Sequence, residues 1–387
     1  MSSHIAIARS LKQAAELRES VVLATVVRVV GSSYGGVGAR MVIRVDGSTV
    51  GLVSGGCLES DLCAHALEVH SSGIARVVTY DTRADDDAVW GLGLGCNGLI
   101  DVLLQPLAAA QARQHADLLT AALSADAPSV IATVTMSGRA TGVPEVGAQA
   151  LFAGADAITV GDWANRNDLA FARAQFDEAL ATGRRGLSRE TGSIELAFEV
   201  VVPAVRLVIC GSGPDVAPVS RLARELGWDT VVVDHRPITE AHTNRFPDAR
   251  VVECREPSDL ADAARLTPGT AGVVMSHHFA RDIGYVSALL AAGVGYVGVL
   301  GPRARTDRML AELAAKGDPA AASGGSLFGP VGLDVGGDGP EAIALAIIAE
   351  VSAVVHGRLP RHLRDRPDAL HGALLPGQRA SIAPDEG

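Results

Sequence analysis

The chain of 387 residues has few aromatic side chains and no long basic run. Only 4% of its residues are aromatic, whereas 48% are hydrophobic, mostly Ala, Val and Leu, as is typical of layered α/β proteins. The net charge is −11, from 44 acidic and 33 basic residues. A field of that sign disfavours binding to nucleic acid or to an anionic membrane surface, so we expect neither as a partner.

The sequence also lacks the marks of a secreted or membrane-spanning protein. Its first residues, MSSHIAIARSLKQAAEL, have the pattern of a short amphipathic helix, without the basic start and apolar block of a signal peptide. No window reaches the roughly 20 uninterrupted apolar residues that cross a bilayer. The five cysteines are scattered and form no CxxC pair, which argues against a zinc ribbon and favours reduced thiols. We therefore expect a cytoplasmic protein.

A glycine turn followed by a cysteine is the first candidate site. Alternating apolar residues over 41–53 predict a β-hairpin, and residues 58–69 have helical spacing. Gly55 and Gly56 lie between the two patterns and would let a ligand approach the backbone. Cys57 then lies at the start of the helix, where free N–H groups and the helix dipole favour an anion or a thiolate. The alternative is that Cys57 is a small buried residue at a tight turn.

Two other glycine-rich stretches lie in the same half of the chain. Residues 31–38 contain four glycines and could present successive N–H groups to an anion, or form a slack turn. Residues 91–98 form a second turn with a cysteine, in which Gly95 precedes Cys96. If this turn and that of Cys57 converge, they frame one pocket with two thiols. Otherwise both cysteines simply pack where glycine turns leave no room for larger side chains.

The second half of the chain alternates between strands and helices. A buried strand, a turn with Gly211 and Gly213, a helix and a strand that ends at Asp234 together predict a βαβ unit. The spacing from Gly211 to Asp234 is that of the dinucleotide-binding fingerprint, although Val216 takes the place of the third glycine. We therefore expect a Rossmann-like fold with a doubly wound parallel sheet. An acid at this position would favour NAD over NADP through the ribose 2′-hydroxyl.

Further polar residues come at the predicted strand ends. The carboxyl ends of strands in open α/β sheets face the ligand crevice, so Asp234, His277, His278 and Arg303 are expected on one rim. Histidines there could orient a substrate or ligate a metal, or could simply bond their own loop. Arg303, just before a helix, could pair with a phosphate or form a surface salt bridge.

Together these patterns predict an α/β chain in four parts. A β-rich N-terminal α+β domain spans residues 1–126, and a connecting α/β layer spans residues 127–205. A Rossmann-like domain follows over residues 206–357, and its last helix is expected to be capped by Asp338. Residues 358–387 are rich in Arg, Pro, Asp and His and are expected to form a flexible tail.

The motifs in this order resemble those of the XdhC/CoxI family. In the first half, the matching runs are Gly31-Ser32-Ser33, Gly38-Ala39-Arg40-Met41, Asp46-Gly47, Gly55-Gly56-Cys57-Leu58-Glu59 and Gly95-Cys96-Asn97-Gly98. In the second half, they are Gly211-Ser212-Gly213-Pro214, Val233-Asp234-His235-Arg236-Pro237, Ser276-His277, Asp282, Gly295-Tyr296-Val297-Gly298, Gly301-Pro302-Arg303, Gly332-Leu333-Asp334 and Pro340-Glu341-Ala342. The resemblance covers most of residues 1–357.

This resemblance implies an accessory protein for molybdenum hydroxylases such as xanthine dehydrogenase. Such a protein binds and protects the molybdenum cofactor (molybdopterin), works with a cysteine desulfurase so that the metal gains its terminal sulfur, and delivers the cofactor to the client enzyme. It implies a maturation chaperone more than a turnover enzyme, often a homodimer. By the resemblance, the thiols of the cofactor-handling domain are Cys57 and Cys96, the glycines beside them are Gly55, Gly56 and Gly95, and the nucleotide-fold motif is Gly211, Gly213 and Asp234.

Other functions stay open at this point. An NAD(P)-dependent oxidoreductase is favoured by the βαβ unit with Asp234 and by His277 and His278 on the crevice rim. A divergent family member with its own chemistry is a further possibility. A scaffold between the desulfurase and the client would hold no small ligand at all.

Overall fold

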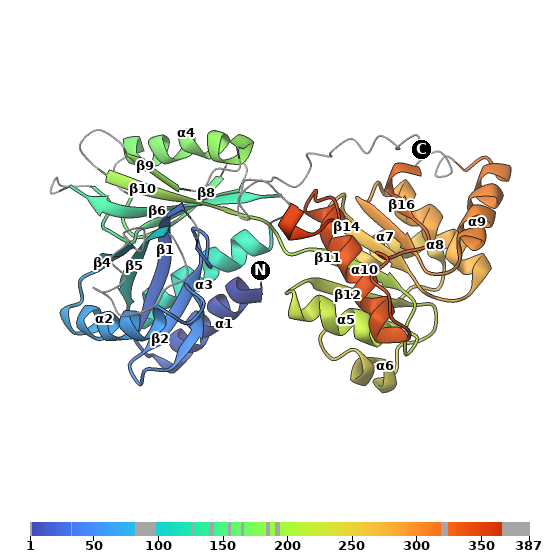
Figure 1. The fold of residues 1–387 in the computed structure, drawn as a ribbon, viewed down its shortest axis with the longest axis horizontal. Coiled ribbons are helices and arrows are strands. Elements are labelled where there is room, and N and C mark those ends of the chain that lie inside the picture. The colour runs from blue at the N-terminus through green and yellow to red at the C-terminus, as the bar shows by residue number, and fades with distance from the viewer. Residues whose placement is uncertain are drawn as a thin grey trace. The chain divides into compact units, whose positions relative to one another are not determined.

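The computed structural model describes residues 2–31, 33–81, 98–125, 127–138, 143–153, 156–163, 166–182, 186–189, 194–318 and 324–365. The chain divides into two compact units, whose main segments are Ser3–Pro203 and Ala204–Arg366. The first unit is coloured blue to green in Figure 1, and the second yellow-green to red.

The first unit begins with an antiparallel sheet in the order β3-β2-β1-β5-β4. Its strands are β1 (Val21–Gly31), β2 (Arg40–Arg44), β3 (Thr49–Gly51), β4 (Arg76–Asp81) and β5 (Gly98–Leu107). The central strand β1 is buried on both faces, which explains its continuous run of apolar residues. On one face, Val22, Ala24 and Val26 pack with Leu62 and Ala66 of helix α2 (Glu59–Ser72). This sheet and α2 position the turn of Cys57.

A second antiparallel sheet completes the first unit, in the order β8-β7-β6-β10-β9. It lies within the part expected as a connecting layer, and its strands are β6 (Ser129–Ser137), β7 (Gln149–Ala153), β8 (Asp156–Val160), β9 (Gly186–Arg189) and β10 (Ile194–Val201). Helix α4 (Arg166–Thr182) covers one face (Figure 1). The two sheets meet at Val27, Leu103 and Ala197. The remaining helices of this unit are α1 (Ser2–Leu17) and α3 (Ala109–Leu123).

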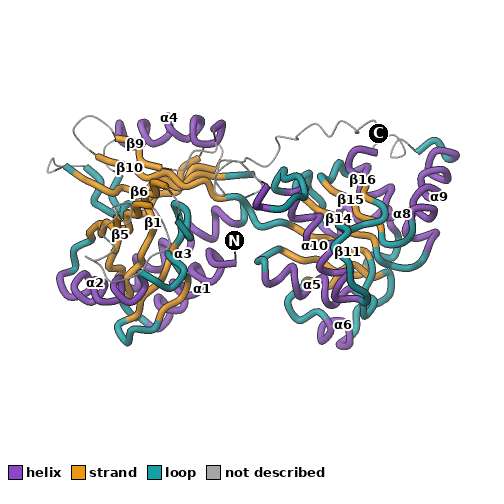
Figure 2. Tube along the Cα trace, viewed as in Figure 1, coloured by secondary structure: helices purple, strands orange, loops and turns teal. Residues whose placement is uncertain are grey.

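The second unit is a Rossmann-like doubly wound domain, which confirms the predicted fold class. Six strands, all parallel, follow the order β13-β12-β11-β14-β15-β16. The strands are β11 (Arg206–Cys210), β12 (Asp229–Asp234), β13 (Arg250–Glu253), β14 (Thr270–Val274), β15 (Tyr296–Val299) and β16 (Leu327–Phe328). The helices are α5 (Val216–Glu225), α6 (Glu240–Arg245), α7 (Leu260–Ala264), α8 (Phe279–Ala291), α9 (Arg303–Ala315) and α10 (Pro340–Val355). Strands and helices alternate along the tube in Figure 2.

Two separate hydrophobic layers hold this unit together. Alternate residues of β11 point to opposite faces: Val208 packs with the face of α7, α8 and α9, and Ile209 with the face of α5 and α10. Because both faces are covered by helices, the strands are unbroken apolar runs in the sequence. This burial leaves the carboxyl ends of the strands and their loops as the polar edge of the domain.

The capping residue of helix α10 lies one position later than the sequence suggested. Gly339, not Asp338, is the residue before its first turn, and Pro340 is the first helical residue. Gly339 has a φ of 92°, a left-handed conformation that glycine adopts without strain. Over the described residues, the helices include none that combines the length and the apolar character needed to cross a bilayer.

Candidate functional site

The turn before α2 presents Cys57 on the surface of the first unit. Gly55, Gly56 and Cys57 are all exposed, and Cys57 lies two residues before the start of the helix. Gly56 has a φ of 105°, and the space where a side chain would stand is open. The interpretation of Cys57 as a small buried residue is therefore wrong, since the thiol faces solvent.

Glu59 closes this turn from within. Its carboxylate accepts hydrogen bonds from the backbone N–H of Ser54 at 2.8 Å, from that of Leu58 at 3.2 Å, and from the Ser54 hydroxyl at 2.5 Å. Burial raises the pKa of Glu59, but these hydrogen bonds outweigh it and lower the pKa below its ordinary value. Glu59 thus already uses the backbone N–H groups of Ser54 and Leu58, just before the helix.

The loop over residues 33–38 packs directly against this turn. A Cβ on Gly35 would fall 2.5 Å from the Val53 carbonyl oxygen, so only glycine allows the close approach. On the other side, the Tyr34 ring lies beside Gly55, 3.5 Å from the position of a Cβ there, and Tyr34 is 63% exposed. Two of the glycine-rich stretches therefore form one surface with an exposed ring and an exposed thiol. Gly95 and Cys96 lie outside the described residues, so the predicted convergence of the two thiols stays a prediction.

A buried ion pair fixes the end of that loop. Arg40 donates to both carboxylate oxygens of Glu199, at 3.0 and 2.6 Å, and its Nη1 also donates to the Gly38 carbonyl at 2.9 Å. His4 Nε2 lies 3.0 Å from the same carboxylate. Burial opposes the charge on Glu199, but the Arg40 guanidinium holds its pKa at about 2. This network joins β2, β10 and α1 beneath the glycine loop.

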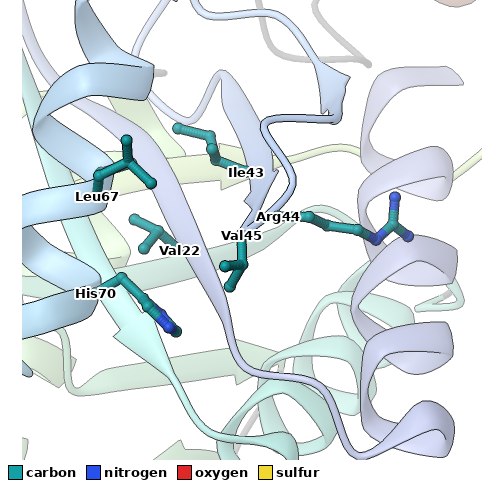
Figure 3. A pocket seen from close by; sticks show the side chains of 7 residues that line it. Val22, Ile43, Arg44, Val45, Leu67 and His70 are labelled. Carbon is teal, nitrogen blue, oxygen red and sulfur yellow. The ribbon is translucent and has the colours of Figure 1, made fainter.

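A shallow hollow of about 200 Å³ lies between α2 and the sheet, away from the Cys57 turn. Figure 3 shows its lining from α2 and the strands, which is Val22, Ile43, Arg44, Val45, Ala66, Leu67 and His70. Because this space is open to solvent, the hollow encloses little more than the volume of a single water molecule.

In the second unit, the structure brings the predicted glycine turn together with the predicted rim residue His277. Gly211 follows β11 with a φ of 137°, and a Cβ there would meet the backbone of Met275 at 2.5 Å. A Cβ on Gly213 would instead collide with the carboxylate of Asp215. That carboxylate pairs with His277 Nε2 at 2.7 Å, and His277 has a φ of 60°, which is uncommon for a residue with a side chain. The pair bridges the loops after β11 and β14.

Asp234 was expected from the sequence to face a ribose, but its carboxylate is engaged inside the protein. It accepts hydrogen bonds from the backbone and side chain of Arg236 and from the Ser212 hydroxyl. Burial raises the pKa of Asp234, but the bonds from Arg236 and Ser212 lower it below its ordinary value. Sequence reasoning missed Arg236 as a partner, although it stands two residues after the acid.

The other rim residues are exposed. His278 is the residue before α8, and Arg303 is the first residue of α9. The ion pair in this region comes from Arg305, whose Nη2 lies 2.7 Å from the buried Asp282. Among the residues that the structure describes, no group of three or more His, Cys, Asp or Glu side chains is arranged to hold a metal ion.

Comparison with known proteins places both units in one family. Residues 14–81 match the model of the XdhC and CoxI family, and residues 207–351 match that of the XdhC Rossmann domain. The chain is 30% identical over 337 residues to a Bacillus subtilis (strain 168) protein described as a probable xanthine dehydrogenase subunit, and the match covers 87% of this chain and 93% of that protein. It is 35% identical over 108 residues, 28% of this chain and 33% of the other, to the molybdenum cofactor insertion chaperone PaoD of Escherichia coli (strain K12).

A solved structure agrees with these matches. The crystal structure of a xanthine dehydrogenase from Bacillus halodurans is similar with a TM-score of 0.71 and 30% sequence identity. The similarity covers 94% of this chain and 98% of that one. The glycine turn of Cys57 lies within the first family match, and the Gly211 turn, Asp234 and His277 lie within the second. The chain therefore belongs to the XdhC and CoxI family.

Proposed function

We propose that the chain binds molybdenum cofactor, supports its sulfuration and delivers it to a molybdenum hydroxylase such as xanthine dehydrogenase. The observation that carries this proposal is the exposed thiol of Cys57 on a glycine turn, beside the exposed ring of Tyr34. Relatives named for xanthine dehydrogenase and for molybdenum cofactor insertion support the same function.

The residues of the turn suit a flat cargo with a metal at one end. Gly55 and Gly56 leave the backbone accessible, and the Tyr34 ring offers a planar surface on which a conjugated ring system can stack. The Cys57 thiol is a soft donor and lies three residues from Ser54, which anchors the turn through Glu59. Because Glu59 already accepts from the N–H groups of Ser54 and Leu58, we expect the anionic groups of the cargo to lie away from these two donors.

The test begins with protein purified without air from cells supplied with molybdate. Oxidation to the fluorescent pterin product, with metal analysis of the same sample, should give pterin and molybdenum near one per chain. Cys57→Ser should reduce this retention and the activation of an apo-hydroxylase. Cys63→Ser is the matched control, since Cys63 lies on α2, packs against the core and should leave both unchanged. Equal retention in the two variants would remove Cys57 from the site.

The partners are proposals of the same kind. We assign the sulfuration itself to a cysteine desulfurase that works with this chain, and we expect the chain to act as a cytoplasmic homodimer. Co-purification with a desulfurase and with the client hydroxylase tests the first part, and light scattering of the purified protein tests the second. A pull-down of both partners without bound pterin would favour the scaffold function instead.

The second candidate function is an NAD(P)-dependent oxidoreductase. The Rossmann strand order and the His277–Asp215 pair on the rim favour it. Turnover of a reduced nicotinamide nucleotide with small carbonyl or quinone acceptors, lost in His277→Ala, would support it. Nucleotide binding without turnover would leave the nucleotide as a structural or regulatory ligand.

A further inference from the structure

The reversal of strand order in the second unit defines where a ligand can enter. From β11 the chain adds β12 and β13 on one side, and then β14 and β15 on the other. Ligands of open α/β sheets bind outside the carboxyl ends of the strands at such a reversal. The turn after β11 and the residues after β12 therefore face the same crevice.

Asp234 cannot act there as the acceptor for a ribose hydroxyl. Asp234 is 4% exposed. Its Oδ1 accepts two hydrogen bonds from Arg236, one from the backbone N–H at 2.8 Å and one from the side-chain Nε at 3.1 Å. Oδ2 accepts from Arg236 Nη2 at 2.8 Å and from the Ser212 hydroxyl. A carboxylate offers about four acceptor positions, and these four bonds use them. The ribose 2′-hydroxyl of a bound nucleotide would therefore lack the hydrogen-bond acceptor that an acid at this position ordinarily supplies.

Two arginines form the polar surface in its place. The Arg236 side chain is 61% exposed above Asp234, and its Nη2 also lies 3.3 Å from the Ser212 hydroxyl. Arg245, exposed in the last turn of α6, donates from Nη1 to the Ser212 carbonyl at 2.8 Å. Both guanidinium groups therefore contact the residue between the two glycines of the turn. With one carboxylate between them they leave an excess positive charge, and the planar guanidinium group suits the oxygens of a phosphate.

The end of the crevice at the start of α5 carries a negative charge. The Asp215 carboxylate lies over Gly213 at the start of α5 and is held by His277 at 2.7 Å. In dinucleotide-binding domains the pyrophosphate lies at this helix start. A carboxylate there disfavours a second anion, so the attraction for a nucleotide must come from the Arg236 and Arg245 end.

We propose that this crevice binds a phosphate monoester on a ribose, the 2′-phosphate of an NADP-type nucleotide, between Arg236 and Arg245. The preference is the reverse of the one that an acid at the end of β12 suggests from sequence. It is independent of molybdenum cofactor binding, because it uses only residues of the second unit.

Calorimetric titration of the purified full chain tests the proposal. The probes are NADPH, NADH, 2′-AMP, 5′-AMP and inorganic phosphate. We expect NADPH and 2′-AMP to bind at least about tenfold more tightly than NADH and 5′-AMP, since the charge-assisted bonds are made only by the 2′-phosphate. Equal binding of the paired probes, or no binding of any of them, would overturn the proposal. Phosphate that binds as tightly as 2′-AMP would mean an anion site without nucleotide recognition, which also overturns it.

Variants assign the effect to the two arginines. Arg236→Gln keeps a hydrogen-bond donor for Asp234 but removes the charge, and it should abolish the preference for the 2′-phosphate. Arg245→Gln should weaken the preference, and Arg236→Lys, which keeps the charge beside Asp234, should retain part of it. Arg224→Gln is the control, because this arginine is exposed on α5 and pairs with Asp248 at 2.7 Å. A full preference in Arg236→Gln, with the fold intact by circular dichroism, contradicts the assignment.

Discussion

At the scale of single residues, Glu199 forms a buried ion pair within the first unit. Its side chain is 7% exposed and carries a charge because Arg40, 159 positions away in sequence, meets it with two hydrogen bonds. A buried pair of this kind costs free energy to desolvate, but removing one partner costs more, because the other charge stays buried without compensation. Arg40 also holds the Gly38 carbonyl, so the pair supports the loop that carries Tyr34.

Glu199→Gln should destabilise the first unit by about 3–5 kcal/mol, because Arg40 is left without its counter-charge. The pH dependence should change as well. The pKa of Glu199 is about 2 in the folded chain against an ordinary 4.5, so its contribution is complete above pH 4.5 and is lost as the pH falls towards 2. Urea unfolding between pH 7 and pH 3 should show this loss in the wild type and not in the variant.

The control for this prediction is Asp117→Asn. Asp117 forms an exposed i,i+4 pair with Arg113 at 3.1 Å, and such surface pairs contribute little. Loss of this surface pair should change the free energy of unfolding by no more than about 0.5 kcal/mol. If Glu199→Gln were as mild as Asp117→Asn, the buried pair would have no net role in stability.

The sequence predicted where single residues lie on the strands, but it did not predict their hydrogen-bond and ion-pair partners. Asp234 was expected at the end of a strand on the crevice rim, and it lies there as the last residue of β12. That Arg236 and Ser212 would use all its acceptors depends on side-chain directions that strand and helix periodicity does not encode. Likewise, no local pattern links Arg40 to Glu199, since the two meet only when both sheets of the unit have formed.

At the scale of elements, the start of α2 combines the anchoring of a turn with the display of a thiol. Glu59 lies in the first turn and reaches back to Ser54, so the turn is tied to the helix rather than left slack. Ser54 in turn accepts a hydrogen bond from the Leu58 N–H at 3.0 Å. Gly55, Gly56 and Cys57 are held between these anchors, which gives the thiol a defined position.

Glu59→Ala should lower the free energy of unfolding by about 1–2 kcal/mol, because several backbone donors lose their acceptor. It should also change the rate at which Cys57 is alkylated by iodoacetamide, as followed by peptide mass spectrometry, since the turn is released. Glu68→Ala is the matched change on the same helix: Glu68 is exposed and pairs with Arg76 at 3.1 Å. An identical alkylation rate in both variants would show that Glu59 does not position the thiol.

Helices and strands were predicted most accurately where a periodic apolar pattern is followed by a glycine turn. The βαβ unit from β11 to β12 and the strand–turn–helix at Cys57 were both expected from the sequence. Helix starts were less accurate. The apolar pattern predicts starts at Val219 and Thr306, whereas α5 begins at Val216 and α9 at Arg303. The first turn of a helix has few apolar contacts to mark it, so the hydrophobic pattern sets in only after the helix has begun.

At the scale of the whole molecule, the second unit has what an independent domain needs. Its two hydrophobic layers, one with α7, α8 and α9 and the other with α5 and α10, are built entirely from residues between 205 and 355. All six strands of its sheet pair only with one another in the described part of the chain. A core that is complete within one segment of sequence predicts that this segment folds alone.

A fragment of residues 204–366 should therefore be soluble and unfold in a single cooperative transition. Its far-ultraviolet circular dichroism should be that of a mixed α/β domain, and its preference for NADPH over NADH should equal that of the full chain, because Arg236 and Arg245 both lie within it. Retained fold with lost nucleotide preference would mean that the first unit contributes to the crevice. A fragment that stays unfolded would show that the boundary at Ala204 cuts through a cooperative unit, since the two layers of the core would then need the first unit to form.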